Sequence, residues 1–568
     1  MTPTRSSTDL WFSVQARLLL AVLALLSACG GGGGAPGVPL PGPLPDPTPA
    51  TVAVSGFSPV VPACNGGNSS GTLFAEAEVE PFAAIAPGNA NLILSAWQQD
   101  RASNGGARAL VSAVSVDGGR NWARTLHPMS RCGGAAPGAV GDFERASDPW
   151  VDIGPDGAAY MMGLAFNGGS FVAGSSSAML VSRSADGGRN WGPPQSLQRD
   201  GEQFFNDKNT LTADVTDGRF VYAIWDRLDT AGNGPALMAR STNAGLSWEP
   251  TRAIYTPVAA GGVSQTIGNR IVVLSDGPQR GTLVNVFVQI DSSGGNSSSR
   301  IRVIRSNDKG LSWGAPITVA DHRSVGTRDP DTGTAIRDGA IVPNIATGAG
   351  GVIWVAWQDG RFSGGLRDAI ALSRSTDGGL TWSAPVAVNK DPNVAAFTPT
   401  LAVRGDGSVG LMHYDLRSNT ASAATLLADL WLITSRDGLS WSETALRRSA
   451  DMLFAPSVTG GLFLGDYHGL VVSGNTFIPV VAVPGTSTAN RSDIVSMRID
   501  PVVSTQQQTL ANASAVRSAS AAHLARAARP VPAGLSESDF ARAHSDAVRR
   551  AMEWRVPGWA TRVDAAPR

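Results

Sequence analysis

The sequence predicts an all-β protein built as a β-propeller, because one short motif recurs six times and each copy follows the same pair of strand-like segments. The motif is Ser-x-Asp-x-Gly-x-x-Trp, with Asn in place of Asp in the third copy and one residue fewer before Trp in the last. Its copies begin at Ser115, Ser184, Ser241, Ser306, Ser375 and Ser435. A repeat of roughly 55 to 70 residues is typical of four-stranded propeller blades.

The residue types of the motif suit a hairpin tip that is anchored to its own blade. The Asp side chain can accept hydrogen bonds from neighbouring backbone N–H groups, Gly adopts positive φ, and Trp packs beneath the turn. These positions are therefore expected to be structural: Asp117, Trp122, Asp186, Trp191, Asn243, Trp248, Asp308, Trp313, Asp377, Trp382, Asp437 and Trp441.

The six copies resemble the Asp box, also called the BNR repeat, of the sialidase superfamily. The resemblance extends over roughly residues 75–500. It implies a propeller whose boxes lie on the outer rim and define the fold without defining the chemistry.

The apolar segment before each box allows the blades to be counted. These second strands are expected at Leu92–Trp97, Ala159–Phe166, Phe220–Trp225, Leu283–Ile290, Val352–Trp357 and Val409–Tyr414. A seventh unit without a box follows, with strands at Gly465–Val472, Phe477–Val483 and Asp493–Ile499. The pattern favours seven blades, with Thr51–Phe57 adding a strand that closes the ring and removes free edges. Six blades, as in the sialidases, is the alternative.

The N-terminal segment carries a targeting signal. Arg5 and Arg17 precede the apolar run Leu18–Leu26, which is too short for a spanning helix. Leu26-Ser27-Ala28-Cys29 resembles the lipobox of bacterial lipoproteins, which implies acylation of Cys29; a chance Cys after an ordinary secretory signal is the alternative. Because no Asp follows Cys29, the resemblance favours the outer membrane, with the protein facing the periplasm or the cell surface.

The expected organisation has four parts: a signal peptide at 1–28, a Gly- and Pro-rich tether at 29–50, the propeller at 51–502 and an Ala- and Arg-rich helical tail at 503–568. In the tail, the sequence predicts a helix over Ser536–Trp554 that is capped by Ser536. The two remaining cysteines, Cys64 and Cys132, are expected to form a disulfide in an oxidising compartment. A metal pair is less favoured because no His lies near either.

Aromatic, acidic and arginine residues recur together where the second strands end. If these positions are equivalent, Arg101, Arg227, Arg361 and Arg417 could bind a polyol or a carboxylate at one face. The alternative, favoured by the repetition, is that each Asp pairs with its own Arg and holds a loop in place. The starts of the innermost strands add candidates for the central channel, which are Glu80, Asp148, Asp207, Arg270, Asn344 and Asp466.

The resemblance to sialidases implies three arginines on the substrate carboxylate, a Tyr nucleophile activated by Glu, and an Asp acid/base. Tyr467 precedes a strand of the boxless unit as the family's nucleophile does, although a structural turn explains it equally well. The family's opening Arg-Ile-Pro motif is replaced here by Glu78-Val79-Glu80-Pro81-Phe82. A Glu at that position would repel sialic acid, so the sequence departs from the sialidase pattern.

Charge and motifs exclude several function classes. The formal net charge of −1 provides no basic face for nucleic acid, and the sequence has no HExxH, phosphate loop, GxSxG elbow or Cys/His cluster, so no metal or other cofactor is expected. We expect a monomeric, lipid-anchored protein of the bacterial envelope that binds a glycan or another extracellular ligand. One alternative is an exo-acting, sialidase-like glycoside hydrolase, with Tyr467, Glu80, Asp148 or Asp207 as catalytic groups and an arginine such as Arg101 or Arg361 holding an acidic sugar. The other is a non-catalytic protein-interaction scaffold.

Overall fold

The computed structural model describes residues 48–501, except 68–69 and 260, and residues 534–564. The expected signal peptide, Cys29 and nearly all of the tether lie outside the described residues, as does the first part of the expected tail. Among the described residues, no helix is both long and apolar enough to cross a membrane.

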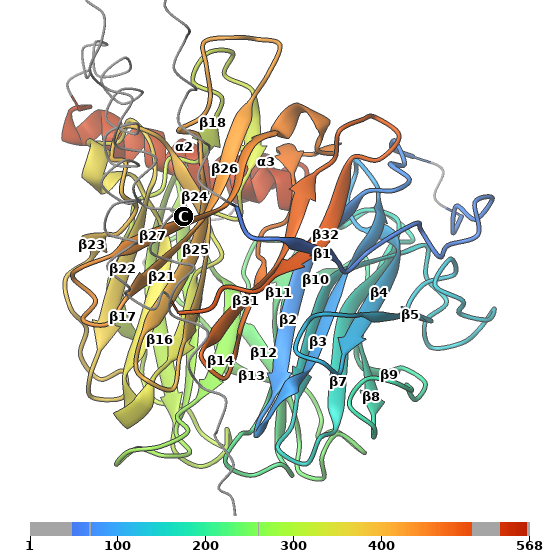
Figure 1. Cartoon of the computed structure of the whole chain (residues 1–568). Helices are drawn as coiled ribbons and strands as arrows, with labels where there is room; N and C mark the ends of the chain where they lie inside the picture. The colour runs from blue at the N-terminus through green and yellow to red at the C-terminus, as the bar shows by residue number, and fades with distance from the viewer. Residues whose placement is uncertain (1–47, 68–69, 260, 502–533, 565–568) are drawn as a thin grey trace, which may run out of the picture. The chain divides into compact units, whose positions relative to one another are not determined.

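Seven four-stranded antiparallel units make up the propeller, whose strands are labelled in Figure 1, and a single residue pair, Ala107 with Ala146, joins the first two units into one sheet. Their innermost strands are β2 (Glu78–Ala86), β6 (Arg145–Ile153), β10 (Phe204–Ala213), β14 (Val263–Val273), β20 (Asn344–Thr347), β24 (Ala396–Val403) and β30 (Gly469–Ser473). Their second strands are β3 (Asn89–Arg101), β7 (Ala159–Asn167), β11 (Val221–Asp229), β15 (Leu283–Ser293), β21 (Ile353–Asp359), β25 (Val409–Asp415) and β31 (Thr476–Pro484).

The outer half of each blade completes the set. The third strands are β4 (Ala107–Ser115), β8 (Ser176–Ser184), β12 (Ala236–Ser241), β16 (Asn296–Ser306), β22 (Ala369–Ser375), β26 (Leu427–Ser435) and β32 (Ser492–Met497). The outermost strands are β5 (Ala123–His127), β9 (Gln195–Gly201), β13 (Arg252–Tyr255), β17 (Ile317–His322), β23 (Val386–Ala387), β27 (Ser442–Asp451) and, from the N-terminal side, β1 (Thr51–Ala53).

The seven innermost strands form a closed ring, in which each contacts the next and β30 contacts β2. The ring closes because β1 pairs antiparallel with β32, so that Val52 lies opposite Ser496 and the last blade contains both ends of the propeller chain. This confirms the prediction of seven blades and of the strand that closes them. We call the end of the propeller at which the innermost strands begin the mouth end.

A small sheet lies outside the blades and was not expected from the sequence. It consists of β18 (Thr327–Arg328), β19 (Ala335–Arg337), β29 (Gly461–Phe463) and β28 (Ser457–Val458), with β19 and β29 parallel. It joins the connection before the fifth blade to the connection before the seventh. Three short 3-10 turns interrupt other connections: η1 (Ala349–Gly351), η2 (Gly360–Ser363) and η3 (Met452–Phe454).

The six sequence repeats form the turns between third and fourth strands. In the first, the Ser115 hydroxyl donates to Asp117 Oδ1 at 2.8 Å, and the same oxygen accepts from the backbone N–H groups of Arg120 and Asn121 at 3.0 and 2.9 Å. Ser115 Oγ also accepts from Gly119 N at 2.8 Å. The corresponding Ser accepts from a glycine N–H in the other five turns, so each turn satisfies backbone groups of its own at the surface.

The core consists of apolar side chains between adjacent blades. Trp97, Trp225 and Trp357, at the ends of three second strands, are fully buried. Each indole N–H donates to a side-chain oxygen, namely Gln99 Oε1 at 3.0 Å, Asn206 Oδ1 at 2.9 Å and Asp359 Oδ2 at 2.8 Å. A buried indole needs such a partner, so these tryptophans fix where the polar ends of the strands begin.

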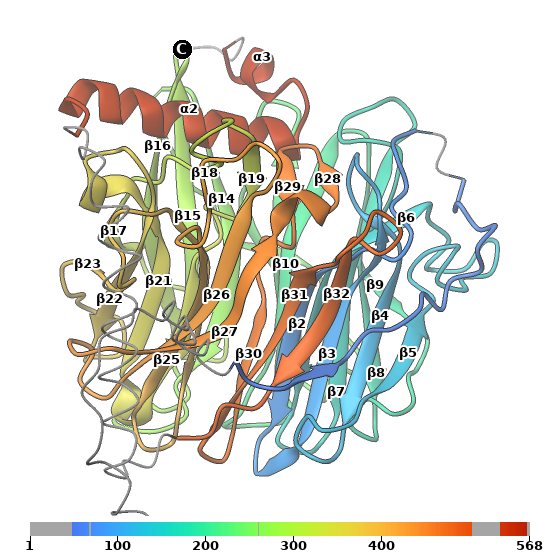
Figure 2. The ribbon, with the colours of Figure 1, turned by 45° about the horizontal axis from the view of Figure 1, so that its top comes forward.

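The expected C-terminal helix is confirmed as α2 (Glu537–Arg555), capped by Ser536, whose hydroxyl oxygen accepts from Asp539 N at 3.2 Å. A short helix, α3 (Trp559–Asp564), follows it. Figure 2 shows α2 running along one end of the strands.

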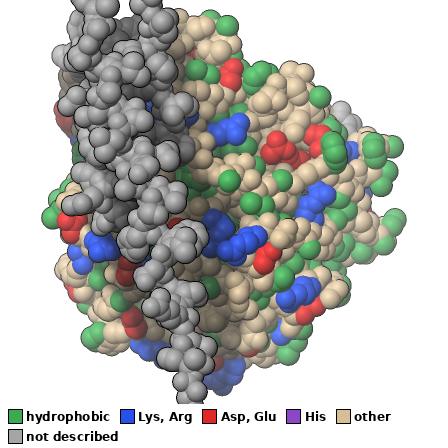
Figure 3. Space-filling view, viewed as in Figure 1, with side chains coloured by type: hydrophobic (Ala, Val, Ile, Leu, Met, Phe, Trp, Pro, Cys, Tyr) green, Lys and Arg blue, Asp and Glu red, His purple; other side chains and the backbone are tan. Residues whose placement is uncertain are grey.

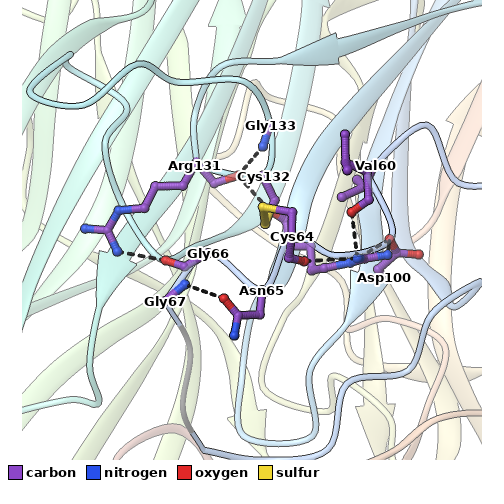
Figure 4. The surroundings of a disulfide bond; sticks show 12 residues. Val60, Cys64, Asn65, Gly66, Gly67, Asp100, Arg131, Cys132 and Gly133 are labelled. Atoms are coloured by element: carbon purple, nitrogen blue, oxygen red, sulfur yellow. Dashed lines mark hydrogen bonds and ion pairs between the residues drawn. A yellow bond between two sulfur atoms is a disulfide. The ribbon is translucent and has the colours of Figure 1, made fainter.

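Cys64 and Cys132 form a disulfide that ties the segment after β1 to the connection after β5. Figure 4 shows the surrounding contacts, in which Arg131 Nη1 donates to Gly66 O at 2.7 Å and Gly67 N donates to Asn65 Oδ1 at 3.0 Å. On the face shown in Figure 3, acidic and basic side chains of the described residues are interspersed.

We expect the double substitution Cys64→Ala/Cys132→Ala to lower the free energy of unfolding by about 2–4 kcal/mol, because the bridge closes a long loop in the unfolded chain. Urea denaturation monitored by tryptophan fluorescence measures the change. A reductant should lower the unfolding midpoint of the wild-type protein and leave that of the variant unchanged. Equal midpoints for the oxidised wild type and the variant would contradict a stabilising role.

Candidate functional site

The innermost strands carry a β-bulge close to the mouth end. The register shifts between Val79 and Phe82 in β2, between Ser147 and Trp150 in β6, and between Asp207 and Thr210 in β10. Within these bulges Glu80, Asp148 and Lys208 adopt left-handed φ values of 55°, 51° and 49°. Such conformations cost about 1 kcal/mol or more for residues other than glycine, and they concentrate at functional sites.

The bulges bring charged side chains from three blades together at the axis of the ring. Lys208 Nζ lies 2.7 Å from Asp466 Oδ2, 3.5 Å from Glu80 Oε1 and 3.5 Å from Asp148 Oδ2. Arg337, from the small sheet, makes a two-pronged contact with Asp466 at 3.2 and 2.7 Å. We call Glu80, Asp148, Lys208, Arg337 and Asp466 the axial cluster.

The axial cluster is held in place by backbone contacts as well as by charge. Glu80 Oε1 accepts from Asp466 N at 3.1 Å, and Asp148 Oδ2 accepts from Lys208 N at 3.1 Å. Gly465 has φ of 139°, and a Cβ there would lie 2.8 Å from Glu80 Cα, so only glycine permits the first and last blades to approach this closely.

Burial and charge displace the pKa values of these carboxyl groups in opposite directions. Burial raises the pKa of Glu80 from 4.5 to about 7, and Lys208 offsets only part of this effect. Burial likewise raises the pKa of Asp148. For Asp466, the Arg337 and Lys208 cations outweigh burial and hold the pKa well below its ordinary value. One group able to carry a proton near neutral pH thus contacts the same ammonium group as one that stays ionised.

Tyr467, the sequence-based candidate nucleophile, lies beside the axial cluster and is buried. Its hydroxyl donates to Pro149 O at 3.1 Å, and its ring lies edge-on to that of Trp150 at 5.2 Å between centroids. Burial, followed by the nearby carboxylates of Glu80 and Asp148, raises the pKa of Tyr467 well above its ordinary value. In this arrangement Tyr467 is a neutral hydrogen-bond donor, and its catalytic role stays a prediction.

Two further candidates from the inner strands take other positions. Arg270 lies over the stacked rings of Phe82 and Trp150, with its guanidinium carbon 5.2 and 5.3 Å from their centroids. Asn344 Oδ1 accepts from Leu401 N at 3.0 Å, which links the fifth blade to the sixth.

The four arginines at the ends of second strands are engaged by groups of the chain itself. Arg361 pairs with Asp359 at 2.8 Å, and Arg417 pairs with Asp415 at 2.6 Å and with Glu443 at 2.7 Å. These two follow the pairing of neighbours along the chain that the sequence offered as an alternative to ligand binding.

The other two arginines depart from that pattern. Arg227 pairs with Asp200, on the outermost strand of the preceding blade, at 2.6 Å. Arg101 donates to Gln98 Oε1 at 2.5 Å and lies over the Phe463 ring, 4.9 Å from its centroid. The Arg337 guanidinium carbon is 4.6 Å from the same centroid. Arg101 is therefore the second-strand arginine that adjoins the axial cluster.

Asp207 and Asp226 form a second acidic site beside the axial cluster. They lie opposite each other on β10 and β11, and both pair with Arg555 at the end of α2. Arg555 Nη1 also donates to Gln265 Oε1 on β14 at 3.0 Å. We call Asp207, Asp226 and Gln265 the Arg555 pocket. Burial raises the pKa of Asp207, but the Arg555 and Lys208 cations outweigh it, so the pKa is lowered.

Sequence analysis missed Lys208, Arg337 and Arg555. Lys208 had a usable signal, since it is one of only three lysines and follows the candidate Asp207 directly. The bulges had another, because Pro81, Pro149 and Pro399 stand inside innermost strands, where proline indicates an interrupted ladder. Nothing local distinguishes Arg337 or Arg555 from other arginines.

Two other features of the described residues do not involve the candidate site. No group of three or more His, Cys, Asp and Glu side chains in this part of the chain is arranged to hold a metal ion. An open cavity of about 620 Å³ lies at the turns of the third and fourth blades, lined by polar residues that include Arg280, Arg305 and Lys309. None of the candidate residues lines that cavity.

No protein-family model and no curated protein matches the chain. Among solved structures, it is similar to the Hadza microbial sialidase Hz136, at 16% identity and a TM-score of 0.41 over 72% of this chain and 76% of that one. A mutant of NanB sialidase from Streptococcus pneumoniae aligns at 10% identity and a TM-score of 0.41, over 80% of this chain and 99% of that one. An α-L-arabinanase from Penicillium chrysogenum, complexed with arabinobiose, aligns at 12% identity and a TM-score of 0.39, over 62% of this chain and 93% of that one. Likeness this distant assigns no activity or site residue to this chain.

We expect Glu80→Gln to flatten the pH dependence of stability between about pH 4.5 and pH 7. Because folding raises the pKa of Glu80, the folded protein binds more protons than the unfolded chain in this range. Glu80 therefore makes the free energy of unfolding fall as pH rises. The substitution should remove up to about 3 kcal/mol of that fall. Urea denaturation from pH 5 to pH 8 measures it. Glu202→Gln, at an exposed carboxylate, is the control, and an identical fall in Glu80→Gln would contradict the assignment.

Proposed function

We propose that this chain is a lipoprotein of the bacterial envelope whose propeller binds a glycan at the mouth end. The observation that carries the proposal is the group of carboxyl side chains with oppositely displaced pKa values at the axis, where blades far apart in sequence meet. Carboxylates and amides that converge from several strands are suited to accept hydrogen bonds from the hydroxyl groups of a sugar.

The axial cluster also supports glycoside hydrolysis as a second candidate function. Such hydrolysis needs one carboxyl group that carries a proton near neutral pH and a second group that stays ionised. Glu80, with its pKa near 7, suits the first role, and Asp466, with its lowered pKa, suits the second. Tyr467 is the third group of interest, because the sequence resemblance assigns it the nucleophilic role.

Binding should be tested on a glycan array with the soluble chain from residue 51 onward. We expect Asp148→Asn to weaken binding about tenfold or more, because the substitution removes the negative charge of the carboxylate that lies 3.5 Å from Lys208 Nζ. Asp186→Asn is the control, since it lies in a repeat turn and the third repeat carries Asn243 at the same place. Binding by Asp148→Asn that equals the wild type would exclude the axial cluster as the site.

A panel of fluorogenic glycosides, including a sialoside, distinguishes hydrolysis from binding. Release that is lost in Tyr467→Phe supports a hydrolase that uses this hydroxyl. Release that persists in Tyr467→Phe but is lost in Glu80→Gln assigns the chemistry to the carboxyl groups. Binding without release leaves a glycan-binding propeller.

The membrane anchor is tested separately on the full chain in its bacterial host. We expect Cys29→Ala to leave the membrane fraction and to lose labelling by radioactive palmitate, because the proposed acyl acceptor is then absent. The double variant Cys64→Ala/Cys132→Ala is the matched control, since it removes the other cysteines and should stay in the membrane fraction. Retention and labelling of Cys29→Ala would contradict the lipoprotein assignment.

A further inference from the structure

The C-terminal segment α2–α3 is docked on the mouth end by contacts specific to its sequence. Ser545 Oγ accepts from Ser297 N at 2.8 Å, at the hairpin between β15 and β16. A ring nitrogen of His544 lies 2.7 Å from Ser324 O, and the other lies 3.1 Å from Ser299 Oγ. These contacts fix the position of α2 along its own axis, so that the same residues always face the same loops.

Aromatic side chains of the segment fit against glycines in the loops of two blades and in the turn between β28 and β29 of the small sheet. A Cβ on Gly365 would lie 2.5 Å from the Phe540 ring, and one on Gly460 would lie 2.6 Å from the Trp554 ring. A Cβ on Gly232 would lie 3.0 Å from the ring of Trp559, which is fully buried. The mouth end is therefore shaped to receive this segment.

Arg555, the last residue of α2, enters the Arg555 pocket. Its side chain is only 5% exposed, with Nε paired to Asp207, Nη2 to Asp226 and Nη1 bonded to Gln265. Acceptors on β10, β11 and β14 thus surround one planar guanidinium group from different directions. Two carboxylates on one cation favour a guanidinium or ammonium group at this position over a neutral one.

The charges around the pocket favour a cation once Arg555 is absent. Five carboxyl side chains (Glu80, Asp148, Asp207, Asp226 and Asp466) then share three basic side chains, which are Lys208, Arg101 and Arg337. Even with a proton on Glu80, four carboxyl side chains face three basic side chains that are already engaged, so an acidic sugar would meet a net negative site. This argues against the acidic ligand considered from the sequence.

We infer that the Arg555 pocket is a cation-binding subsite of the mouth end, that Arg555 occupies it in cis, and that the ligand is a glycan bearing free amino groups that competes with Arg555. Only the identity of the ligand as a glycan rests on the proposed function. The cation subsite follows from the contacts of Arg555 and can be tested without any glycan.

The subsite is tested by chemical rescue of Arg555→Ala in the chain from residue 51 onward. Ethylguanidinium at millimolar concentration should bind the variant and raise its unfolding temperature, whereas tetramethylammonium at the same ionic strength should not, because it lacks hydrogen-bond donors. Arg542→Ala, which changes an exposed arginine on the same helix, is the control and should not respond. Equal responses of both variants to both cations would overturn the cation subsite.

The ligand class is tested by calorimetric titration with hexamers of glucosamine, N-acetylglucosamine and galacturonic acid. We expect Arg555→Ala to bind the glucosamine hexamer about tenfold or more tightly than the wild type, because the internal competitor is gone. Tighter binding of the galacturonic acid hexamer, or of an arginine-rich peptide in place of glucosamine, would overturn the proposed ligand. If ethylguanidinium stabilises Arg555→Ala but no glycan binds, the proposed glycan-binding function is rejected and the cation subsite is supported.

The wild-type protein provides a test that does not depend on how the variant folds. Competition predicts that the glucosamine hexamer increases hydrogen–deuterium exchange of amides in α2 and α3, because the segment is displaced when the hexamer binds. Binding of the hexamer with unchanged exchange in α2 and α3 would overturn the competition.

Discussion

The pairing of β1 with β32 is the constraint on which the rest of the structure depends, because it builds the last blade from both ends of the propeller chain. Without it the last blade would end in the unpaired edge of β32, and no strand from the N-terminal side would hold that blade in the ring. Closure places Asp466 beside Glu80, 386 residues away in the sequence. The axial cluster is thus a product of the ring, since no single blade contains it.

The axial cluster has an electrostatic cost that the rest of the fold must offset. Removing several charges from water costs several kcal/mol per ion, which mutual attraction offsets only when the geometry is favourable. Here a lysine faces three carboxylates, and hydrogen bonds from Gln98 and from the backbone of Asp466 complete the coordination of Glu80. The left-handed backbone at Glu80, Asp148 and Lys208 adds strain. Strain and buried charge at the same residues suit a site that is maintained for function.

The C-terminal segment docks on the end of the propeller where the axial cluster lies. Its apolar side chains Val548, Met552, Val556 and Trp559 belong to a core cluster shared with the fourth and fifth blades, so the segment is part of the folded unit. Its one deeply buried charge is directed at the acidic residues of the mouth end. A segment that combines apolar docking with a single charged insertion can cover a polar site without leaving that site's charges unpaired.

The sequence by itself determined the blade architecture, because the signals for it are local. Each copy of the repeated motif, each apolar strand segment and the capping residues of α2 can be recognised within about ten residues. Their order along the chain predicted seven blades, the closing strand and the helix. The tertiary structure alone decided which charges meet. Arg555 and Asp207 are 348 residues apart, and Arg337 reaches Asp466 across 129 residues through a small sheet with no repeat signature. Pairing of charges depends on distance in space and on burial, and neither has a period that can be seen along the chain.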